Sequence, residues 1–447
     1  MCASKYDFER PMSAERATLM LPLHVVMAAR IRGHVDFGET RSAIEKLRTR
    51  HSLLAVRVRI DDNDKAWYTN KDVPRLPFRA IERKTDFQWL DVALEEYKTS
   101  FPVDIGPLVR FALLYSDEVS ELIICGHHAI CDGISLAYLI RDILKKLATP
   151  SDIVEQLPLP PAVDFEMVPN PPKKGFVANA VISLVNRAWR KKKLRFDFNL
   201  MKQMHKRYWQ ENSNVRQLTW RLSESKTTKL VKCCREKGVT VNSVLWAVFL
   251  VAQDKVQGSD ELFRSRAGLA INTRNKLKVP VGESFGFYAS SHRVFLKNFQ
   301  GKSFWDTATT IHEQLKRSIN SADPFKMLSA TLLAPTLIDS LYFSKYGFFT
   351  NGISTKLLKK MMWDKVNYGY AITNVGRVDI PTSYGDLKLD AVYGPLVYSD
   401  VNEKTVGVIT VGKSATFWMS YNENRIDSGT ATKFRDAVEG LLQEVTE

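Results

Sequence analysis

Apolar and polar residues alternate along short stretches of the first third of the chain, the pattern of half-buried β-strands. Residues 52–60 are predicted as one such strand, and residues 108–115 and 121–125 as two neighbours joined by a turn at 116–118. From 133 to 147 the apolar residues recur at helical spacing instead. Strands and helices therefore alternate in this part of the chain.

The second half of the chain continues this mixture. Residues 240–252 are apolar nearly all round, which predicts a buried helix. The expected strands are 217–222, 267–271, 406–411 and 415–421, and a last helix is expected at 428–445. The predicted fold class is α/β, with strands and helices forming two-layer lobes.

Proline-rich stretches at 157–161 and 169–172 continue neither strand nor helix, and they mark a domain boundary. A chain of 447 residues also exceeds what one hydrophobic core usually organises. We therefore expect a first lobe at 1–170, a basic connecting segment at 171–210 and a second lobe at 211–447. Two lobes leave room for a cleft between them.

The charge balance narrows the choice of partners. The chain has 64 Lys and Arg against 49 Asp and Glu, a formal net charge of +15. This charge favours nucleic acid, an anionic membrane, an acidic carrier protein or a phosphate-rich cofactor such as coenzyme A. No zinc finger, aromatic RNA-binding strand or recognition helix is evident, so no nucleic-acid partner is expected. The first residues lack a secretory signal, and a cytoplasmic location is expected.

The strongest charge feature follows the apolar residues 176–185, where basic residues gather around Trp189 as far as Arg195. One interpretation is an interfacial helix that contacts an anionic membrane or an acidic partner near Trp189. The other is a connecting helix with a solvated basic end, which we prefer. The apolar stretch is too short to cross a bilayer.

The segment His127-His128-Ala129-Ile130-Cys131-Asp132-Gly133 links a predicted strand to a predicted helix. A neutral histidine accepts a proton from a hydroxyl or amine near pH 7 and returns it later, so this ring suits general acid–base chemistry. Plainer explanations exist for each residue. A histidine at a strand end is often packed in the core, Asp132 fits a helix N-cap, and Gly133 fits a tight turn.

The five cysteines are Cys2, Cys125, Cys131, Cys233 and Cys234. Their number is odd and none has the paired spacing of a zinc site, so we expect reduced thiols. A nucleophilic thiol or a metal centre beside the histidine pair is the less favoured interpretation, because Cys125 closes an apolar stretch and further ligands are not evident. No metal is expected.

The whole histidine string matches the HHxxxDG motif, and in this the chain resembles the condensation-type acyltransferase superfamily. Within it the chain is similar to stand-alone relatives of the condensation domains of peptide synthetases, alcohol acetyltransferases, wax-ester synthases and polyketide-associated acyltransferases. Three later segments agree in order with family members: 271–274, ending in Arg274; the glycine-containing loop 282–288; and 373–377, which resembles an SNxGR segment.

The resemblance implies two chloramphenicol acetyltransferase-like lobes that form a V around a central channel. In it His128 is the general base, supported by Gly133 and by Asp132 paired in bidentate fashion with Arg274. The residues expected to bind substrate or shape the channel are His127, Ser284, Tyr288 and Asn374. The donor for the oxyanion is left open among the Gly133 N–H, Ser284 and Asn374.

The implied reaction moves an acyl group from a thioester, acyl-CoA in preference, to the hydroxyl of a small molecule. An amide-forming or carrier-protein-dependent condensation enzyme is the close alternative, and a non-catalytic binding member of the superfamily is the third. No tightly bound cofactor is expected, since acyl-CoA or an acyl carrier protein acts as co-substrate. The chain lacks the DFGWG motif of the plant branch and any adenylation or carrier sequence, which favours a free-standing enzyme.

Overall fold

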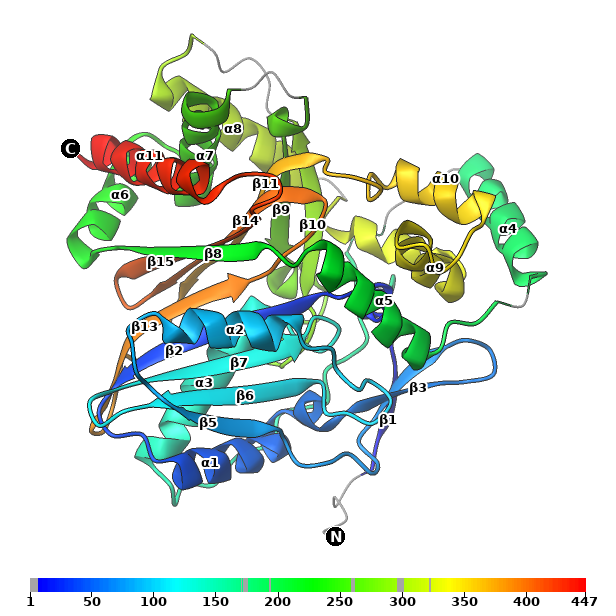
Figure 1. Ribbon diagram of the computed structural model, residues 1–447, viewed down its shortest axis with the longest axis horizontal. Helices are drawn as coiled ribbons and strands as arrows, with labels where there is room; N and C mark the ends of the chain where they lie inside the picture. The colour runs from blue at the N-terminus through cyan, green and yellow to red at the C-terminus, as the bar shows by residue number, and fades with distance from the viewer. Residues whose placement is uncertain are drawn as a thin grey trace.

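The computed structural model describes residues 7–169, 171, 176–192, 194–258, 262–295, 301–320 and 323–447. It has two lobes, each built on a six-stranded sheet with helices against it (Figure 1). A small third sheet has the strand order β1 (Glu9–Pro11), β4 (Ala66–Thr69) and β3 (Arg57–Ile60). The predicted α/β class and the two lobes are confirmed.

The first-lobe sheet carries the histidine motif at the end of its central strand β7. Its strands, in spatial order, are β12 (Ser383–Tyr384), β13 (Leu387–Leu396), β2 (His24–Arg32), β7 (Val119–His127), β6 (Val109–Tyr115) and β5 (Phe78–Glu82). Its helices are α1 (Phe37–Arg50), α2 (Gln88–Lys98) and α3 (Gly133–Ala148). Figure 1 shows α2 in front of this sheet and α3 behind it.

The second-lobe sheet mixes parallel and antiparallel pairs. Its strands, in spatial order, are β10 (Ala289–Phe295), β9 (Arg266–Asn272), β11 (Tyr368–Val378), β14 (Asn402–Val411), β15 (Ser414–Asn422) and β8 (Val215–Leu222). Its helices are α6 (Glu224–Glu236), α7 (Val241–Gln257), α8 (Phe304–Asn320) and α11 (Ser428–Thr446). As predicted, α7 lies in the core, with Trp246 and Phe249 fully buried.

The lobes are not two consecutive parts of the chain. Strands β12 and β13 come from the C-terminal part, yet they join the first-lobe sheet, where Leu389 pairs with Ile31. The chain then returns to the second lobe as β14. There β13 and β14 pass so close together that position 407 has no room for a side chain: a Cβ on Gly407 would lie 2.0 Å from the Pro395 carbonyl oxygen. The expected division at 170 and 210 does not include this crossover, because strand pairing between distant segments leaves no local pattern.

Four further helices lie beside the lobes: α4 (Phe176–Arg190), α5 (Phe198–Glu211), α9 (Pro335–Lys345) and α10 (Gly352–Lys360). The first two belong to the predicted basic connecting segment. Within the described residues, no single helix is long and apolar enough to cross a membrane. Helices α6 and α7 meet that test of length and composition only as a pair, and they are bent by 103°.

The predicted strand at 52–60 is wrong in its first half. Ser52–Ala55 form a 3-10 helix, and the strand begins at Arg57. Leu53 and Leu54 are both buried in the first-lobe core, at 1 % and 0 % exposure. Packing against the first-lobe core therefore overrides the local alternation.

Candidate active site

The histidine pair stands where strand β7 gives way to helix α3. β7 ends at His127 and α3 begins at Gly133, so His128 lies in the short loop between strand and helix, as predicted. Its backbone N–H donates to the Leu23 carbonyl at 3.1 Å, which ties the loop to the residue before β2. His127 is 1 % exposed, whereas His128 is partly exposed. His128 is therefore the ring of the pair that a substrate can reach.

One hydrogen bond determines how His128 can act. Its Nδ1 lies 2.8 Å from the carbonyl oxygen of Cys131. Because a carbonyl only accepts, Nδ1 carries the hydrogen and Nε2 keeps a lone pair. Burial lowers the pKa of His128 below its usual 6.5, against the opposing effects of the Cys131 carbonyl and the Asp132 carboxylate. The ring is therefore neutral at pH 7 and able to accept a proton at Nε2.

Phe287 restricts the movement of the His128 ring from the second lobe. The two ring centroids are 5.1 Å apart and the planes meet at 78°, an edge-to-face contact. Phe287 is 8 % exposed and belongs to the loop 282–288 that precedes β10. The orientation of the candidate base thus depends on both lobes.

His127 lies in the core of the first lobe. Its Nδ1 accepts the Ala129 N–H at 3.1 Å, and its ring contacts those of His24 and Phe101. Burial lowers its pKa to about 3, and nearby histidines add to the effect. His127 is therefore neutral and packed in the core, and its predicted part in shaping a channel stays a prediction.

Asp132 combines the two roles considered from the sequence. Its Oδ1 accepts the Ser135 N–H at 2.8 Å, the N-cap of α3. The same oxygen lies 3.0 Å from Nη2 of Arg274, and Oδ2 accepts the Tyr288 N–H at 3.1 Å. The helix cap is therefore also the contact between the lobes, and the carboxylate is 6 % exposed.

Arg274 pairs with Asp132 as predicted, but the bidentate geometry is wrong. Only Nη2 reaches the carboxylate, and it also donates to Ser135 Oγ at 2.6 Å. Nη1 donates to the carbonyls of Ser284 at 2.8 Å and Gly282 at 3.2 Å. The guanidinium is 3 % exposed, and it divides its N–H groups between the motif of one lobe and the loop of the other.

Ser135 is a central residue that sequence reasoning missed. Its Oγ lies 2.8 Å from Asp132 Oδ1 and 2.9 Å from the Gly286 carbonyl, and it accepts from Arg274 and from the Gly286 N–H. One hydroxyl thus meets both backbone groups of Gly286 and both members of the ion pair. Its position three residues after Asp132 was the available signal, but its partners lie 139 and 151 residues away.

Tyr288 and Ser284 were predicted to bind substrate, and the structure places both at the contact between the lobes. The Tyr288 ring packs against the Arg274 guanidinium at 4.5 Å, and burial raises the pKa of its hydroxyl to about 12. Tyr288 is 2 % exposed and Ser284 9 %. Both support the loop 282–288 in this structure, and their contact with substrate stays a prediction.

Gly133 and Asn374 bring β11 of the second lobe against the motif. A Cβ on Gly133 would lie 2.9 Å from Cγ2 of Val375, so a side chain has no room there. The Asn374 side chain is held at both ends, with Nδ2 donating to Asn242 at 3.1 Å and Oδ1 accepting the Gly376 N–H at 2.9 Å. Within the described residues, Nδ2 of Asn374 makes this one hydrogen bond, although an amide nitrogen can donate two.

A second ion pair between the lobes, also missed from the sequence, holds the same loop. Glu283 receives both terminal nitrogens of Arg141 on α3, at 2.5 and 2.6 Å, and Nη2 of Arg50 lies 3.3 Å away. Asp142 lies beneath this group and accepts from Arg50, Arg141 and His51. The loop that carries Phe287 is thus joined to the first lobe at two places.

The cysteines beside the histidine pair do not suit nucleophilic chemistry. Cys125 and Cys131 are fully buried, and burial raises the pKa of the Cys125 thiol to about 12 and that of Cys131 well above its usual range. Within the residues that the structure describes, no group of three His, Cys, Asp or Glu side chains is placed to hold a metal ion.

A family model described as Condensation domain matches residues 23–336, more than half of the chain. The hybrid PKS-NRPS synthetase thnA of Trichoderma harzianum is 31 % identical over 120 residues, 26 % of this chain and 3 % of that protein. Bacitracin synthase 1 of Bacillus licheniformis is 26 % identical over 145 residues, 31 % of this chain and 3 % of its own length. The chain thus matches only a small part of these proteins.

Solved structures match over nearly the whole chain. The TRI3 trichothecene 15-O-acetyltransferase of Fusarium sporotrichioides has a TM-score of 0.65 at 12 % identity, covering 100 % of this chain and 96 % of that one. Polyketide synthase associated protein 5 of Mycobacterium tuberculosis has a TM-score of 0.61 at 16 % identity, covering 98 % of each. At these identities the likeness shows a shared two-lobe fold.

Proposed function

Because the chain belongs to the condensation-domain family, whose superfamily comprises acyltransferases and condensation enzymes, we propose that it transfers an acyl group from a thioester to the hydroxyl of a small molecule. The observation that carries this proposal is the hydrogen bond from His128 Nδ1 to the Cys131 carbonyl. It leaves an unprotonated Nε2 on a partly exposed ring whose pKa lies below 6.5. A general base for acyl transfer needs this state.

In the proposed mechanism His128 handles one proton twice. The acceptor hydroxyl gives its proton to Nε2 while its oxygen attacks the thioester carbonyl carbon, and a tetrahedral oxyanion forms. The carbon–sulfur bond then breaks, and the leaving thiolate takes the proton back from Nε2. The products are an ester and a free thiol, and His128 returns to its neutral form.

Asp132 and Arg274 act in this proposal as positioning residues. Both oxygens of the Asp132 carboxylate are already engaged, by the Ser135 N–H, the Arg274 guanidinium and the Tyr288 N–H, so the proposal gives Asp132 no proton-transfer step. It keeps the loop of His128 in place against the second lobe. The oxyanion donor is proposed among the Gly133 N–H at the start of α3, the Ser284 hydroxyl and the side-chain amide of Asn374.

Acyl-CoA is the donor we favour, because a net charge of +15 attracts its phosphates. The charge also suits an acidic carrier protein, and the two synthetases that match part of the chain keep a carrier-fed, amide-forming reaction as the second candidate. The TRI3 enzyme, with which the chain shares its fold, is an O-acetyltransferase, and this favours the ester. No tightly bound cofactor is needed for either reaction.

Product analysis by mass spectrometry separates these candidates. The protein is incubated with acyl-CoA donors of increasing chain length or with an acyl carrier protein, each with a mixture of alcohols and amines. We expect an ester from at least one acyl-CoA, and on the order of a hundredfold less or lower when His128→Ala replaces the wild type. An amide formed only with the carrier protein would replace the proposal by the second candidate. No product from any donor would contradict acyl transfer.

A further inference from the structure

Helix α4 has one side packed against the molecule and one side bare. On the packed side, the Asn186 side chain donates to the Leu332 carbonyl at 2.7 Å and accepts the Ala334 N–H at 2.8 Å. The Trp189 indole is 1 % exposed and donates to Thr336 Oγ1 at 2.9 Å. Trp189 therefore fixes α4 to the start of α9, and any of the predicted membrane contact near this residue falls to its neighbours on the helix.

The bare side of α4 is apolar as well as basic. Leu184 is 66 % exposed and Val181 52 %. At 100° per residue, Leu184, Arg187 and Lys191 lie along the face opposite Asn186 and Trp189. The exposed leucine thus lies next to cations, on a helix that Figure 1 shows at the edge of the molecule.

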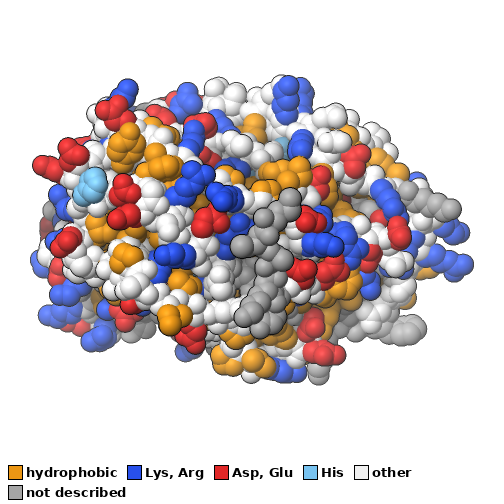
Figure 2. Space-filling view, turned by 90° about the horizontal axis from the view of Figure 1, so that it is seen from below, with side chains coloured by type: hydrophobic (Ala, Val, Ile, Leu, Met, Phe, Trp, Pro, Cys, Tyr) orange, Lys and Arg blue, Asp and Glu red, His pale blue; other side chains and the backbone are white. Residues whose placement is uncertain are grey.

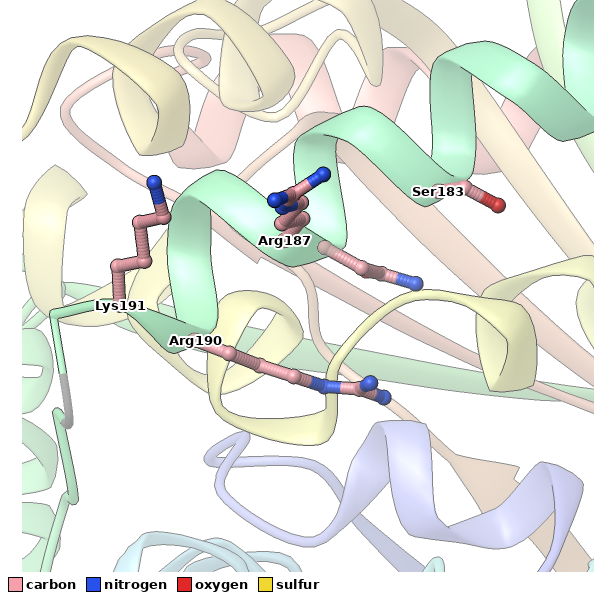
Figure 3. Close-up of a pocket in the computed structure, with 5 residues that line it drawn as sticks. Ser183, Arg187, Arg190 and Lys191 are labelled. Carbon is pink, nitrogen blue, oxygen red and sulfur yellow. The ribbon is translucent and has the colours of Figure 1, made fainter.

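Arg187, Arg190 and Lys191, at the end of α4 and just after it, have no carboxylate partner among the described residues. Ser183, Asn186, Arg187, Arg190 and Lys191 line an open hollow of about 500 Å³, and Figure 3 shows the three basic side chains extending from the helix. No ion pair of these cations with an acidic side chain occurs in the described part of the chain. Between residues 167 and 196 the sequence has eight Lys or Arg and no Asp or Glu.

The surrounding surface strengthens this local charge. Helix α10 lies beside α4 in Figure 1, and the Trp189 ring is 5.9 Å from that of Phe349 just before it. α10 exposes Lys356, Lys359 and Lys360, again with no acidic residue between 340 and 363. By contrast, basic and acidic side chains are interspersed over the face in Figure 2.

We propose that α4 docks the protein on the surface of an anionic lipid bilayer. Leu184 and Val181 enter the boundary between headgroups and acyl chains, while Arg187, Arg190 and Lys191 meet lipid phosphates in the hollow beside them. A basic helix with an exposed apolar face, carried at the edge of the molecule, fits a flat lipid surface. Attraction to an acidic protein would account for the cations but not for the exposed Leu184 and Val181 beside them.

Vesicle sedimentation of the full chain tests this surface. One set of vesicles is phosphatidylcholine alone, and the other contains about one third phosphatidylserine; both are measured at about 0.05 M and about 0.5 M NaCl. We expect binding to the anionic vesicles at low salt, and a fall of at least about tenfold for the double variant R187Q/K191Q. L184S is expected to weaken binding in the same assay without a change in melting temperature.

Matched variants separate this surface from the general charge. K226Q/K229Q removes the same two charges from exposed positions of α6, and I153S replaces an exposed aliphatic residue elsewhere. Both controls should bind like the wild type. Equal losses in the control and α4 variants, an L184S variant that binds fully, or no binding to anionic vesicles at low salt would each overturn the proposal. Capture of an acidic carrier protein without vesicle binding would overturn it as well.

Discussion

Two arginine–carboxylate contacts join α3 of the first lobe to the second lobe, and they differ in how far water reaches them. In the pair of Arg274 with Asp132, the side chains are 4 % and 8 % exposed. In the pair of Arg141 with Glu283, they are 7 % and 40 % exposed, although the second pair has the more regular two-bond geometry. One arginine–carboxylate pair therefore lies in the interior of the protein, and the other lies where its carboxylate reaches the surface.

This difference in exposure predicts that the two contacts contribute unequally to the stability of the protein. Removing one partner of a buried pair leaves an unpaired charge in a poorly hydrated place, which is costly. Removing the Glu283 charge leaves Arg141 with Asp142 as a carboxylate partner at 2.8 Å, so no charge is left unpaired and the cost is small. The irregular contact at Asp132 should therefore matter more than the well-formed one at Glu283.

Loss of the buried guanidinium should have the largest effect. Arg274→Ala strands the Asp132 carboxylate and removes four hydrogen bonds, so we expect a loss of about 3–5 kcal/mol in the free energy of unfolding, measured by urea denaturation. Arg32→Ala is the control, since this arginine is 59 % exposed and 3.6 Å from Asp390. If the Arg274→Ala variant were as stable as the Arg32→Ala control, the proposed contribution of the Arg274–Asp132 pair to stability would be contradicted. A double-mutant cycle with Asp132→Asn should show strong coupling.

Acid should weaken the interior before it weakens the exposed pair. Burial lowers the pKa of His127 to about 3 and that of His205 to about 4, so the folded protein leaves both neutral while the unfolded chain protonates them below about pH 6.5. Above pH 6.5 the two histidines are neutral in both the folded and the unfolded chain, so they do not make the free energy of unfolding depend on pH. As the pH drops from 6.5 toward the folded pKa values, only the unfolded chain takes up these protons, and the free energy of unfolding falls. Together they should remove about 4 kcal/mol by about pH 5.

His205→Asn should flatten this slope by about 1.4 kcal/mol per pH unit in denaturation curves. His34→Asn, at an exposed histidine, should leave the slope unchanged. The Glu283 pKa is lowered by its hydrogen bonds to Arg141, so the exposed pair keeps its contribution until the pH falls below the usual value of a glutamate. A stability that stays constant between pH 6.5 and 5 would contradict the buried neutral histidines.

The hydroxyl inside the buried contact gives an intermediate effect. Ser135→Ala leaves the Gly286 N–H and one Arg274 N–H without a partner, and we expect a cost of about 1–2 kcal/mol in thermal or urea unfolding. Activity should fall with it, because the loop before β10 loses an anchor next to Phe287. Ser225→Ala, at an exposed serine of α6, should change neither quantity. An unchanged Ser135→Ala variant would show that the hydroxyl is dispensable.

The exposed pair should give the smallest effect. Glu283→Gln keeps the shape of the side chain and removes its charge, so we expect under about 1 kcal/mol of destabilisation, and less at high salt. Because Glu283 anchors the loop of Phe287, which contacts His128, we expect a measurable change in KM or kcat even though the free energy of unfolding changes little. A loss as large as that of Arg274→Ala would reverse the comparison between the two contacts.

The sequence was sufficient to predict helices, strands and the motif position of His128, because these depend on residues close together in the chain. Periodicity placed β7, α3 and α7 within a few residues, and the motif located His128 at the junction of strand and helix. It was not sufficient for contacts between distant segments, such as β13 in the first-lobe sheet or Ser135 against Gly286, because one sequence does not show which segments meet. Nor could residue type show that Arg274 spreads its hydrogen bonds over four acceptors.

The burial of Trp189 is another tertiary property that the sequence could not show. A tryptophan among basic residues has the composition of an interfacial anchor, yet here its indole N–H is used inside the fold. Which face of α4 is bare depends on where α9 packs, and that is a tertiary property. That Leu184 is exposed, and so a candidate for the proposed contact, therefore became evident only from the structure.

The pH dependence of kcat/KM for acyl transfer, measured for the wild type and for His128→Ala, tests the central claim most directly. With Nε2 as the base and a pKa below 6.5, the wild-type rate should be constant near pH 7 and fall only below pH 6.5. His128→Ala should lose on the order of a hundredfold or more near pH 7, where the wild-type ring is neutral, with a melting temperature close to that of the wild type. A folded His128→Ala variant that keeps its rate and its acid limb would contradict the account.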